Sequence, residues 1–176
     1  MQPPPSPTQA AIALGSNLGD RAAHLRFALE ALRALPSSTL LASSAYFETP
    51  PLTDSARPAF QPGGPYLNAA ALLSTALPTR DLLSHLLRIE ALRGRDRSVT
   101  TRWAPRTLDL DLLLYGDSII SEPGLTIPHP GLASRAFVLV PLASIAPDLP
   151  IPPTNTTPRH LLAALPPSDF AAICPS

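Results

Sequence analysis

The sequence predicts a single-domain α+β fold in which an antiparallel sheet is covered by helices on one face. Its 176 residues contain no internal repeat, which suits one domain large enough to bury its own core. Apolar runs with the period of a strand or of a helix follow one another in the order βαββαβ. Much of the proline lies at the two ends of the chain and in residues 50–65, where it marks tails and loops.

The first half of the chain predicts a strand, a helix and two more strands. Residues 10–14 are a short apolar run that ends at the turn formers of GSNLGD. Asp20 can cap the following helix, in which apolar residues recur at helical spacing as far as Leu35. Residues 40–49 alternate loosely and contain aromatic rings, as expected of a strand, and we expect 66–75 to pair with them in the antiparallel sense.

The second half predicts a helix, a strand and a last helix. After Pro78, large aliphatic residues recur at helical spacing until Gly94, a residue suited to a left-handed cap. Residues 108–115 form a mostly apolar strand, and residues 131–145 predict the last helix before a proline-rich tail. The complete order predicts a ferredoxin-like sheet whose loops at the open edge are free to carry function.

Composition excludes several classes of function. The sequence has no lysine, which excludes a Walker A phosphate loop, a protein-kinase site and Schiff-base chemistry. The formal net charge is +0, whereas a basic nucleic-acid-binding domain would be positive, so we expect no nucleic-acid partner. No apolar run is long enough to cross a bilayer and no export signal is visible, so we expect no membrane association and a cytoplasmic location. The single Cys174 cannot form an internal disulfide.

Two carboxylates interrupt the apolar strand at residues 108–115. Side chains two apart on a strand point to the same face, so Asp109 and Asp111 should project together while the leucines beside them pack behind. Two like charges on one surface are costly without a cation, whereas a pair of Mg²⁺ ions would match them and could bridge a phosphate chain. The alternative is a half-exposed strand whose acids pair with neighbouring arginines.

An arginine-rich segment precedes these acids. Guanidinium groups bind phosphate oxygens in a bidentate manner and keep their charge, so arginines beside two metal ligands suit a polyphosphate. The alternatives are a solvated charged face or a nucleic-acid patch, and the neutral net charge argues against the second. Six of the 13 arginines lie in residues 88–106, namely Arg88, Arg93, Arg95, Arg97, Arg102 and Arg106.

Two further segments offer binding groups. His129 lies between two prolines that hold it rigidly, and Arg135 and Phe137 follow at the opening of the predicted last helix. A rigid histidine can donate a hydrogen bond to a phosphate, although a structural role explains a lone histidine as well. Tyr66 and Asn68 share one strand face, where a ring can stack on a heterocycle and an amide can bind its edge. Core packing explains Tyr66 equally well.

The most specific motif of the chain is RWAPRTLDLDLLLYG, and ALGSNLGDR, ETPPL, YLNAA, RIEALRGR and LTIPHPGLASRAFVLVPL accompany it. In this order the motifs resemble the 6-hydroxymethyl-7,8-dihydropterin pyrophosphokinase family of folate biosynthesis. The resemblance covers nearly the whole chain, from Ile12 to about Asp148. It implies transfer of the β,γ-pyrophosphoryl group of ATP to the hydroxymethyl group of the reduced pterin, with release of AMP.

The resemblance also implies roles for individual residues. Asp109 and Asp111 would hold two Mg²⁺ ions that bridge the triphosphate of ATP, and Arg95 and Arg106 would be catalytic arginines on a mobile loop. The residues that match ATP-binding positions are Glu90, Arg97, Arg102, Trp103, Arg106, Thr126, His129 and Arg135. The residues that match pterin-binding positions are Thr49, Pro50, Leu52, Tyr66, Asn68, Asp109 and Phe137.

We expect one domain between two tails. Residues 1–9 would be a flexible N-terminal tail, 10–165 the pyrophosphokinase domain and 166–176 a C-terminal tail, in a protein that acts as a monomer. The chain departs from a well-known bacterial pattern at Leu87 and Pro130, near the nucleotide.

Two alternatives to this activity remain. One is a ferredoxin-like binding module for single-stranded RNA, although its aromatic-rich strand pattern is missing from the sequence. The other is a Mg²⁺-dependent phosphoryl or nucleotidyl transferase that acts on a different phosphorus or on another heterocycle.

Overall fold

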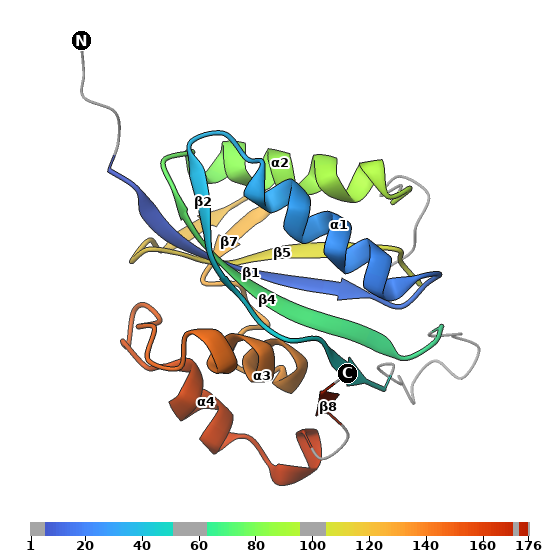
Figure 1. Cartoon of the computed structure of the whole chain (residues 1–176). Coiled ribbons are helices and arrows are strands. Elements are labelled where there is room, and N and C mark those ends of the chain that lie inside the picture. The colour runs from blue at the N-terminus through green and yellow to red at the C-terminus, as the bar shows by residue number, and fades with distance from the viewer. Residues whose placement is uncertain (1–5, 51–62, 96–104, 171–172, 176) are drawn as a thin grey trace.

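The main sheet is antiparallel and has the strand order of a ferredoxin-like fold. The computed structural model of the chain describes residues 6–50, 63–95, 105–170 and 173–175 (Figure 1). The strands of this sheet are β1 (Thr8–Ser16), β2 (Ser38–Ser43), β3 (Phe47–Thr49), β4 (Tyr66–Thr75), β5 (Asp109–Tyr115) and β8 (Cys174–Pro175). They follow the order β5-β1-β4-β3-β8, and β2 pairs with β4 as well. The predicted α+β fold and its order of strands are therefore confirmed.

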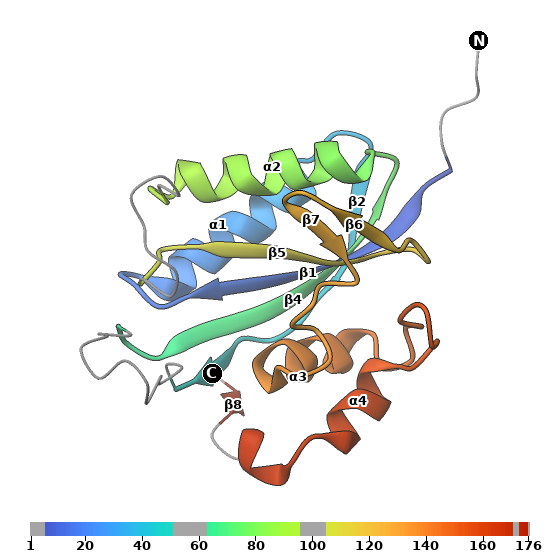
Figure 2. The same cartoon turned by 180° about the vertical axis from the view of Figure 1, so that it is seen from behind.

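Helices cover both faces of this sheet, as Figures 1 and 2 show from opposite sides. They are α1 (Arg21–Arg33), α2 (Thr79–Leu92), α3 (Ala136–Ile145) and α4 (Pro158–Ala164), followed by the 3₁₀ turn η1 (Pro167–Asp169). Helices α1 and α2 lie on one face, and α3, which packs against α4, lies on the other. The expectation of helices on a single face was wrong, because the central strands are apolar on both sides.

Two apolar clusters fill the space between the helices and the sheet. The larger cluster lies beneath α1 and α2 and includes the fully buried Ile12, Leu32 and Leu86. The smaller cluster lies beneath α3 and includes Leu113 of β5 and Leu139 of the helix. Burial of each such side chain contributes about 1.5 to 3 kcal/mol, so both faces of the sheet stabilise the fold.

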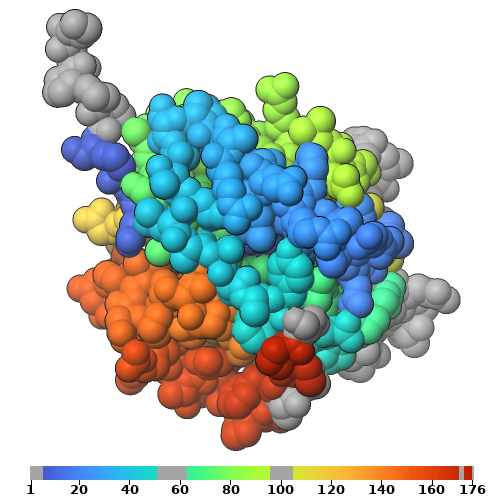
Figure 3. Space-filling model, in the orientation of Figure 1, coloured from blue at the N-terminus to red at the C-terminus, as the bar shows by residue number. Residues whose placement is uncertain are grey.

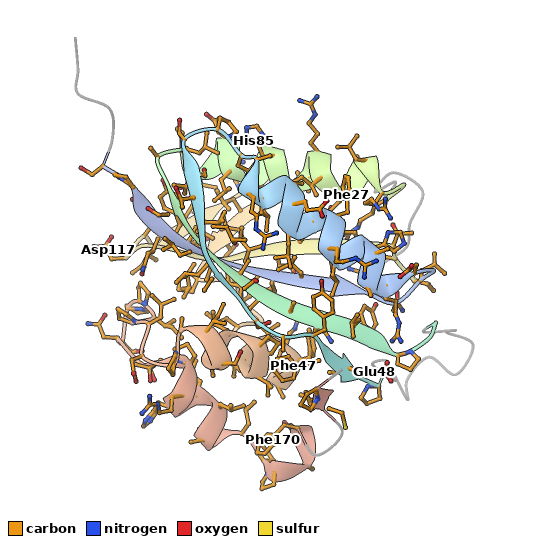
Figure 4. All side chains as sticks on the ribbon, viewed as in Figure 1. Phe27, Phe47, Glu48, His85, Asp117 and Phe170 are labelled. Atoms are coloured by element: carbon orange, nitrogen blue, oxygen red, sulfur yellow. The ribbon has the colours of Figure 1, made fainter. Side chains whose placement is uncertain are left out.

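The predicted cap at the start of α1 and the predicted glycine after α2 are confirmed. Asp20 caps α1, because its Oδ1 accepts a hydrogen bond from the N–H of Ala23 at 2.9 Å. Gly94 follows α2 with a φ of +78°, the left-handed conformation that favours glycine. Near this end, the Arg93 guanidinium lies 4.8 Å from the ring centroid of Phe27, which lies between α1 and α2 (Figure 4).

Two predicted elements differ from the structure. The strand expected at residues 40–49 is divided into β2 and β3, because the Ser44 hydroxyl accepts a hydrogen bond from the Ala70 N–H at 2.9 Å and so replaces a carbonyl of the ladder. The helix expected at residues 131–145 begins only at Ala136. A turn precedes it, in which the Leu132 N–H donates to the carbonyl of residue 129 at 2.9 Å.

Other elements were not expected from the sequence. A hairpin of β6 (Ile120–Glu122) and β7 (Leu125–Ile127) follows β5, and α4 follows the predicted helices. Within residues 166–176, β8 pairs with β3 at the edge of the main sheet, which places the red C-terminal segment against the cyan segment in Figure 3. None of the helices in the described ranges combines the length and apolar character needed to cross a membrane.

Candidate active site

A pocket opens on the α3 face of the sheet, at the N-terminal end of that helix. The hollow measures ≈ 660 Å³ when the open space at its mouth is included. Strands β1, β4 and β5 form its floor. Its described lining residues are Ala13, Leu14, Gly15, Thr49, Pro50, Tyr66, Asn68, Arg106, Asp109, Asp111, Arg135, Phe137 and Val138.

Small residues of β1 leave the base of the pocket open. Gly15 pairs with Asn68 on one side and with Asp109 on the other. A Cβ atom at Gly15 would lie 3.3 Å from Asn68 Oδ1 and 4.0 Å from Asp109 Cβ. Ala13 pairs with Asp111 in the same way, one step along the same face of β1. A larger side chain at Ala13 or Gly15 would therefore fill the space between the Asn68 amide and the two acids.

Two arginines hold Asp109. Arg106 Nη1 donates to Asp109 Oδ2 at 2.5 Å, and Arg95 Nη1 donates to Asp109 Oδ1. Arg95 Nη1 also donates to Oε1 of Glu90 at 2.5 Å, and the side chain of Glu90 is only 1% exposed. The same Oε1 accepts the backbone N–H of Leu110 at 2.7 Å. Glu90 thus links α2 to β5 and holds Arg95 beside the acid.

The two acids have opposite pKa shifts. Burial alone would raise the pKa of Asp109, but the charges of Arg106 and Arg95 lower it below its ordinary value. Burial raises the pKa of Asp111, and the negative charge of Asp109 raises it further. Within the described part of the chain, neither a hydrogen bond nor an ion pair holds the Asp111 carboxylate. A cation placed against Asp111 would therefore stabilise its charged form.

The backbone at Arg106 is tied to the loop between β1 and α1. Asn17 Oδ1 accepts the N–H of Arg106 at 2.8 Å, and the N–H of Asn17 donates to the Arg106 carbonyl at 3.1 Å. Burial would lower the pKa of Arg106, but Asp109 and Tyr66 raise it, so the guanidinium keeps its charge. Burial also raises the pKa of Tyr66, which keeps its hydroxyl protonated beside Arg106.

A buried amide and hydroxyl lie at the β3 side of the pocket. Asn68 Nδ2 donates to Thr49 Oγ1 at 2.9 Å, and both residues are buried. This bond fixes the Asn68 side chain, with its Oδ1 toward Gly15. Tyr66 and Phe137 line the same pocket from the sheet and from α3. The four side chains suit a flat heterocycle, because rings can cover its faces while polar groups bind its edge.

His129 lies beside β5, near Asp111. Its N–H donates to the Leu113 carbonyl at 2.9 Å, and its Nδ1 accepts the N–H of Gly131 at 3.1 Å. In the neutral ring the proton is then on Nε2. Burial lowers the pKa of His129, Asp111 opposes the shift, and Arg135 adds to it. The net lowering favours the neutral ring, which can donate one hydrogen bond from Nε2.

The described candidate residues gather around this pocket with one exception. Nine of them line it, and they are Thr49, Pro50, Tyr66, Asn68, Arg106, Asp109, Asp111, Arg135 and Phe137. Glu90 and Arg95 lie behind Asp109, and His129 lies beside Asp111. Thr126 is exposed on β7 and does not line the pocket. Four candidates lie outside the described residues, namely Leu52, Arg97, Arg102 and Trp103.

Sequence reasoning missed the residues that shape the floor and the base of the pocket. Gly15 and Ala13 form the floor, and Asn17 fixes the backbone of Arg106. The sequence does contain a signal for Ala13 and Gly15: small residues at alternate positions of AAIALGS leave space on one face of a strand. No local pattern predicts the contact of Asn17, because its partner is 89 positions away.

The sequence matches one family and proteins named for its activity. The family model described as 7,8-dihydro-6-hydroxymethylpterin-pyrophosphokinase (HPPK) matches residues 11–147. The chain is 45% identical over 166 residues to the 2-amino-4-hydroxy-6-hydroxymethyldihydropteridine pyrophosphokinase of Methylorubrum extorquens, with 94% of this chain and 99% of the relative covered. It is 43% identical over 155 residues to the protein of the same name from Pseudomonas aeruginosa, with 88% and 90% covered.

Solved structures share the fold. A crystal structure of wild-type Plasmodium falciparum HPPK-DHPS aligns with a TM-score of 0.68 at 14% identity, over 89% of this chain and 44% of that one. An HPPK-DHPS structure in complex with substrates aligns with a TM-score of 0.70 at 12% identity, over 94% and 44%. This chain thus spans less than half of those longer chains, although it spans almost the full length of its Methylorubrum relative. From its sequence, the chain belongs to the 7,8-dihydro-6-hydroxymethylpterin-pyrophosphokinase family.

Proposed function

We propose that this chain transfers the β,γ-pyrophosphoryl group of ATP to the hydroxymethyl oxygen of 6-hydroxymethyl-7,8-dihydropterin, a step of folate biosynthesis. Two observations support this activity: a family model that matches residues 11–147 and relatives of the same name that align over nearly their whole length. The observation that carries the location is the pocket on the α3 face, in which two aromatic rings and a buried amide adjoin two acids.

The pterin would occupy the β3 side of the pocket. Tyr66 and Phe137 would cover the two faces of its ring, because they enter the pocket from the sheet and from α3. Asn68 and Thr49 would bind its edge through polar atoms whose positions their mutual hydrogen bond fixes. A site built on buried polar groups rejects ring systems that leave those groups unpaired, which provides specificity.

The triphosphate would lie across the acids toward the arginines. Arg95 and Arg106 are bound to Asp109, and they would exchange part of this contact for phosphate oxygens when ATP binds. Arg135 and the Nε2–H of His129 would bind phosphates on the Asp111 side. The same proposal includes nucleotide roles for Glu90, Thr126, Arg97, Arg102 and Trp103, and pterin contacts for Pro50 and Leu52.

The acids fit a divalent cation by the chemistry of their oxygen atoms. Asp109 and Asp111 would hold two Mg²⁺ ions, which prefer carboxylate oxygens and retain waters and substrate phosphates as further ligands. The described residues contain no group of three or more candidate metal ligands, so the phosphates would have to complete the coordination. When bound, the ions supply neutralisation of the triphosphate charge and a template for its alignment.

The side chains would then contribute position and charge. The pterin contacts of Asn68 and Thr49 would point the hydroxymethyl oxygen at the β-phosphorus, which meets the in-line requirement of phosphoryl transfer. Arg95 and Arg106 would stabilise charge on the transferred group as it leaves AMP. The same proposal includes action as a monomer in the cytoplasm, where ATP is available.

The experiment that tests this function separates the adenine nucleotides after incubation. The protein is mixed with ATP, Mg²⁺ and 6-hydroxymethyl-7,8-dihydropterin, with a matched sample that lacks the pterin. AMP that forms only with the pterin supports pyrophosphoryl transfer. ADP instead of AMP would contradict it and indicate an ordinary kinase, and release of pyrophosphate with a nucleotidylated pterin would indicate a nucleotidyl transferase.

A further inference from the structure

We propose that Gly131 is a positioning residue that sets Arg135, and with it His129, for binding of the ATP triphosphate. The inference rests on the proposed function, because it concerns two residues assigned there to phosphate binding. Gly131 itself does not line the pocket and is not a candidate from the sequence. Its role would be to leave space for one side chain and to orient another.

The backbone does not require a glycine at this position. Pro130 and Gly131 are the central residues of a turn that the Leu132 N–H closes onto the His129 carbonyl at 2.9 Å. The φ of Gly131 lies outside the left-handed range that several other glycines of the described chain adopt. Turns of this kind accept most residues after a central proline. A side chain at this position is therefore limited by neighbouring atoms and not by the backbone conformation.

Arg135 provides that constraint. A Cβ atom at Gly131 would lie 2.5 Å from Arg135 Nε, 2.6 Å from Cζ and 2.9 Å from Cδ. These separations are shorter than any van der Waals contact, so Arg135 would have to move. In its present place the guanidinium lies 5.8 Å from the ring centroid of Phe137 and lines the pocket with Asp111. A flexible side chain moves at little cost to stability, so the substitution would reduce phosphate binding by Arg135 rather than the stability of the fold.

The same residue orients His129. The N–H of Gly131 donates to His129 Nδ1 at 3.1 Å, which leaves the Nε2–H of the neutral ring as the free donor. One residue of the turn therefore controls two groups that face Asp111, one through a missing side chain and the other through its backbone. Alanine at this position would keep the backbone N–H and would disturb only the first of these two effects.

The test is a double-mutant cycle with nucleotide affinity as its readout. The dissociation constant of α,β-methylene-ATP with Mg²⁺ is measured by calorimetry for the wild type, Gly131→Ala, Arg135→Ala and the double variant. We expect Gly131→Ala to weaken binding about tenfold, the size of one lost charge-assisted contact, with the melting temperature within about 2 °C of the wild type. In the Arg135→Ala background, Gly131→Ala should have no further effect, because its target is already absent.

A control and two contrary results complete the test. Ser134→Ala alters an exposed residue of the same segment and should leave affinity unchanged. Wild-type affinity in Gly131→Ala, or equal losses from Gly131→Ala in both backgrounds, would overturn the inference. Wild-type affinity in Arg135→Ala would overturn it as well and would also remove Arg135 from the proposed phosphate site. The formation of AMP by the wild-type protein tests the proposed function separately.

Discussion

Replacement of Glu90 by glutamine should destabilise the protein and displace Arg95, although the two side chains have almost the same shape. Glu90 Oε1 accepts hydrogen bonds from the Leu110 N–H at 2.7 Å and from Arg95 Nη1 at 2.5 Å. Its side chain is 1% exposed, so water cannot replace these bonds. The glutamine removes the negative charge and leaves a neutral carbonyl oxygen to accept from both donors. Glu90→Gln therefore tests a link between α2 and β5.

The size of the effect follows from these contacts. A hydrogen bond to a charged group contributes about 1.5 to 3 kcal/mol, and loss of one partner of a buried ion pair costs about 3 to 5 kcal/mol. Arg95 keeps Asp109 as a second counter-charge, so the cost lies closer to that of the lost hydrogen bond than to that of a broken ion pair. We expect Glu90→Gln to lower the free energy of unfolding by about 2 to 3 kcal/mol. The turnover number should also fall, because Arg95 loses one of the two acids that place it.

Urea unfolding followed by circular dichroism measures this change. With a slope of about 2 kcal/mol per molar urea, the midpoint should fall by about 1 to 1.5 M. The matched control is Glu30→Gln, which makes the same chemical change at an exposed position of α1 and should stay within about 0.5 kcal/mol of the wild type. Equal midpoints for the two variants would refute the reasoning that the buried Glu90 stabilises the contact between α2 and β5.

Three further substitutions have expected outcomes. Asp111→Asn should abolish AMP formation and leave the urea midpoint unchanged or slightly raised, since the substitution relieves like-charge repulsion. Thr49→Val removes the acceptor of the Asn68 amide, 2.9 Å away, and should raise the KM for the pterin more than the KM for ATP. Burial lowers the pKa of His24, and the charge of Arg93 lowers it further. As pH falls below about 6.5, His24 is therefore protonated in the unfolded chain before it is protonated in the folded protein. Stability from His24 is therefore present above that pH and lost below it, and His24→Gln should unfold with a smaller difference in urea midpoint between pH 7.5 and pH 5.5.

Each of these outcomes has a contrary result. Wild-type turnover in Asp111→Asn would exclude the metal-binding role of that carboxylate. Thr39→Val is the control for Thr49→Val, because Thr39 is exposed on β2, and equal pterin KM values for the two would contradict the pterin contact. An unchanged pH dependence in His24→Gln would show that its hydrogen bond with Arg93 Nε, 2.9 Å long, does not couple stability to pH.

Much of the fold was predictable because its signals are local. The Asp20 cap, the left-handed Gly94 and the apolar spacing between them predicted both helices of the first face. The α3 face was not predictable in the same way. Strands that are apolar on both sides need cover on both, but Ala11 and Ala70 are too small to reveal a second packing face by periodicity. The division of residues 40–49 depended on a serine whose partner lies on another strand.

The candidate site was predictable at the level of residue types. Strand periodicity placed Asp109 and Asp111 on one face, and both line the pocket. The prediction that acids could pair with neighbouring arginines also describes Asp109, which Arg95 and Arg106 hold, while Asp111 has no such partner among the described residues. Among the described residues, pairing with arginines therefore applies to Asp109 and not to Asp111, a distinction that the spacing in the sequence does not contain.

The sequence by itself determined the family, the βαββαβ order of the main strands and helices, and the chemistry available in LDLD and its arginines. These follow from composition, from periods of two or about four residues, and from motifs read within one segment. Only the tertiary structure decided that Gly15 separates Asn68 from Asp109, that Glu90 is buried against β5, and that Gly131 leaves room for Arg135. Those relations arise from strand register and packing between distant segments, and no local pattern specifies them.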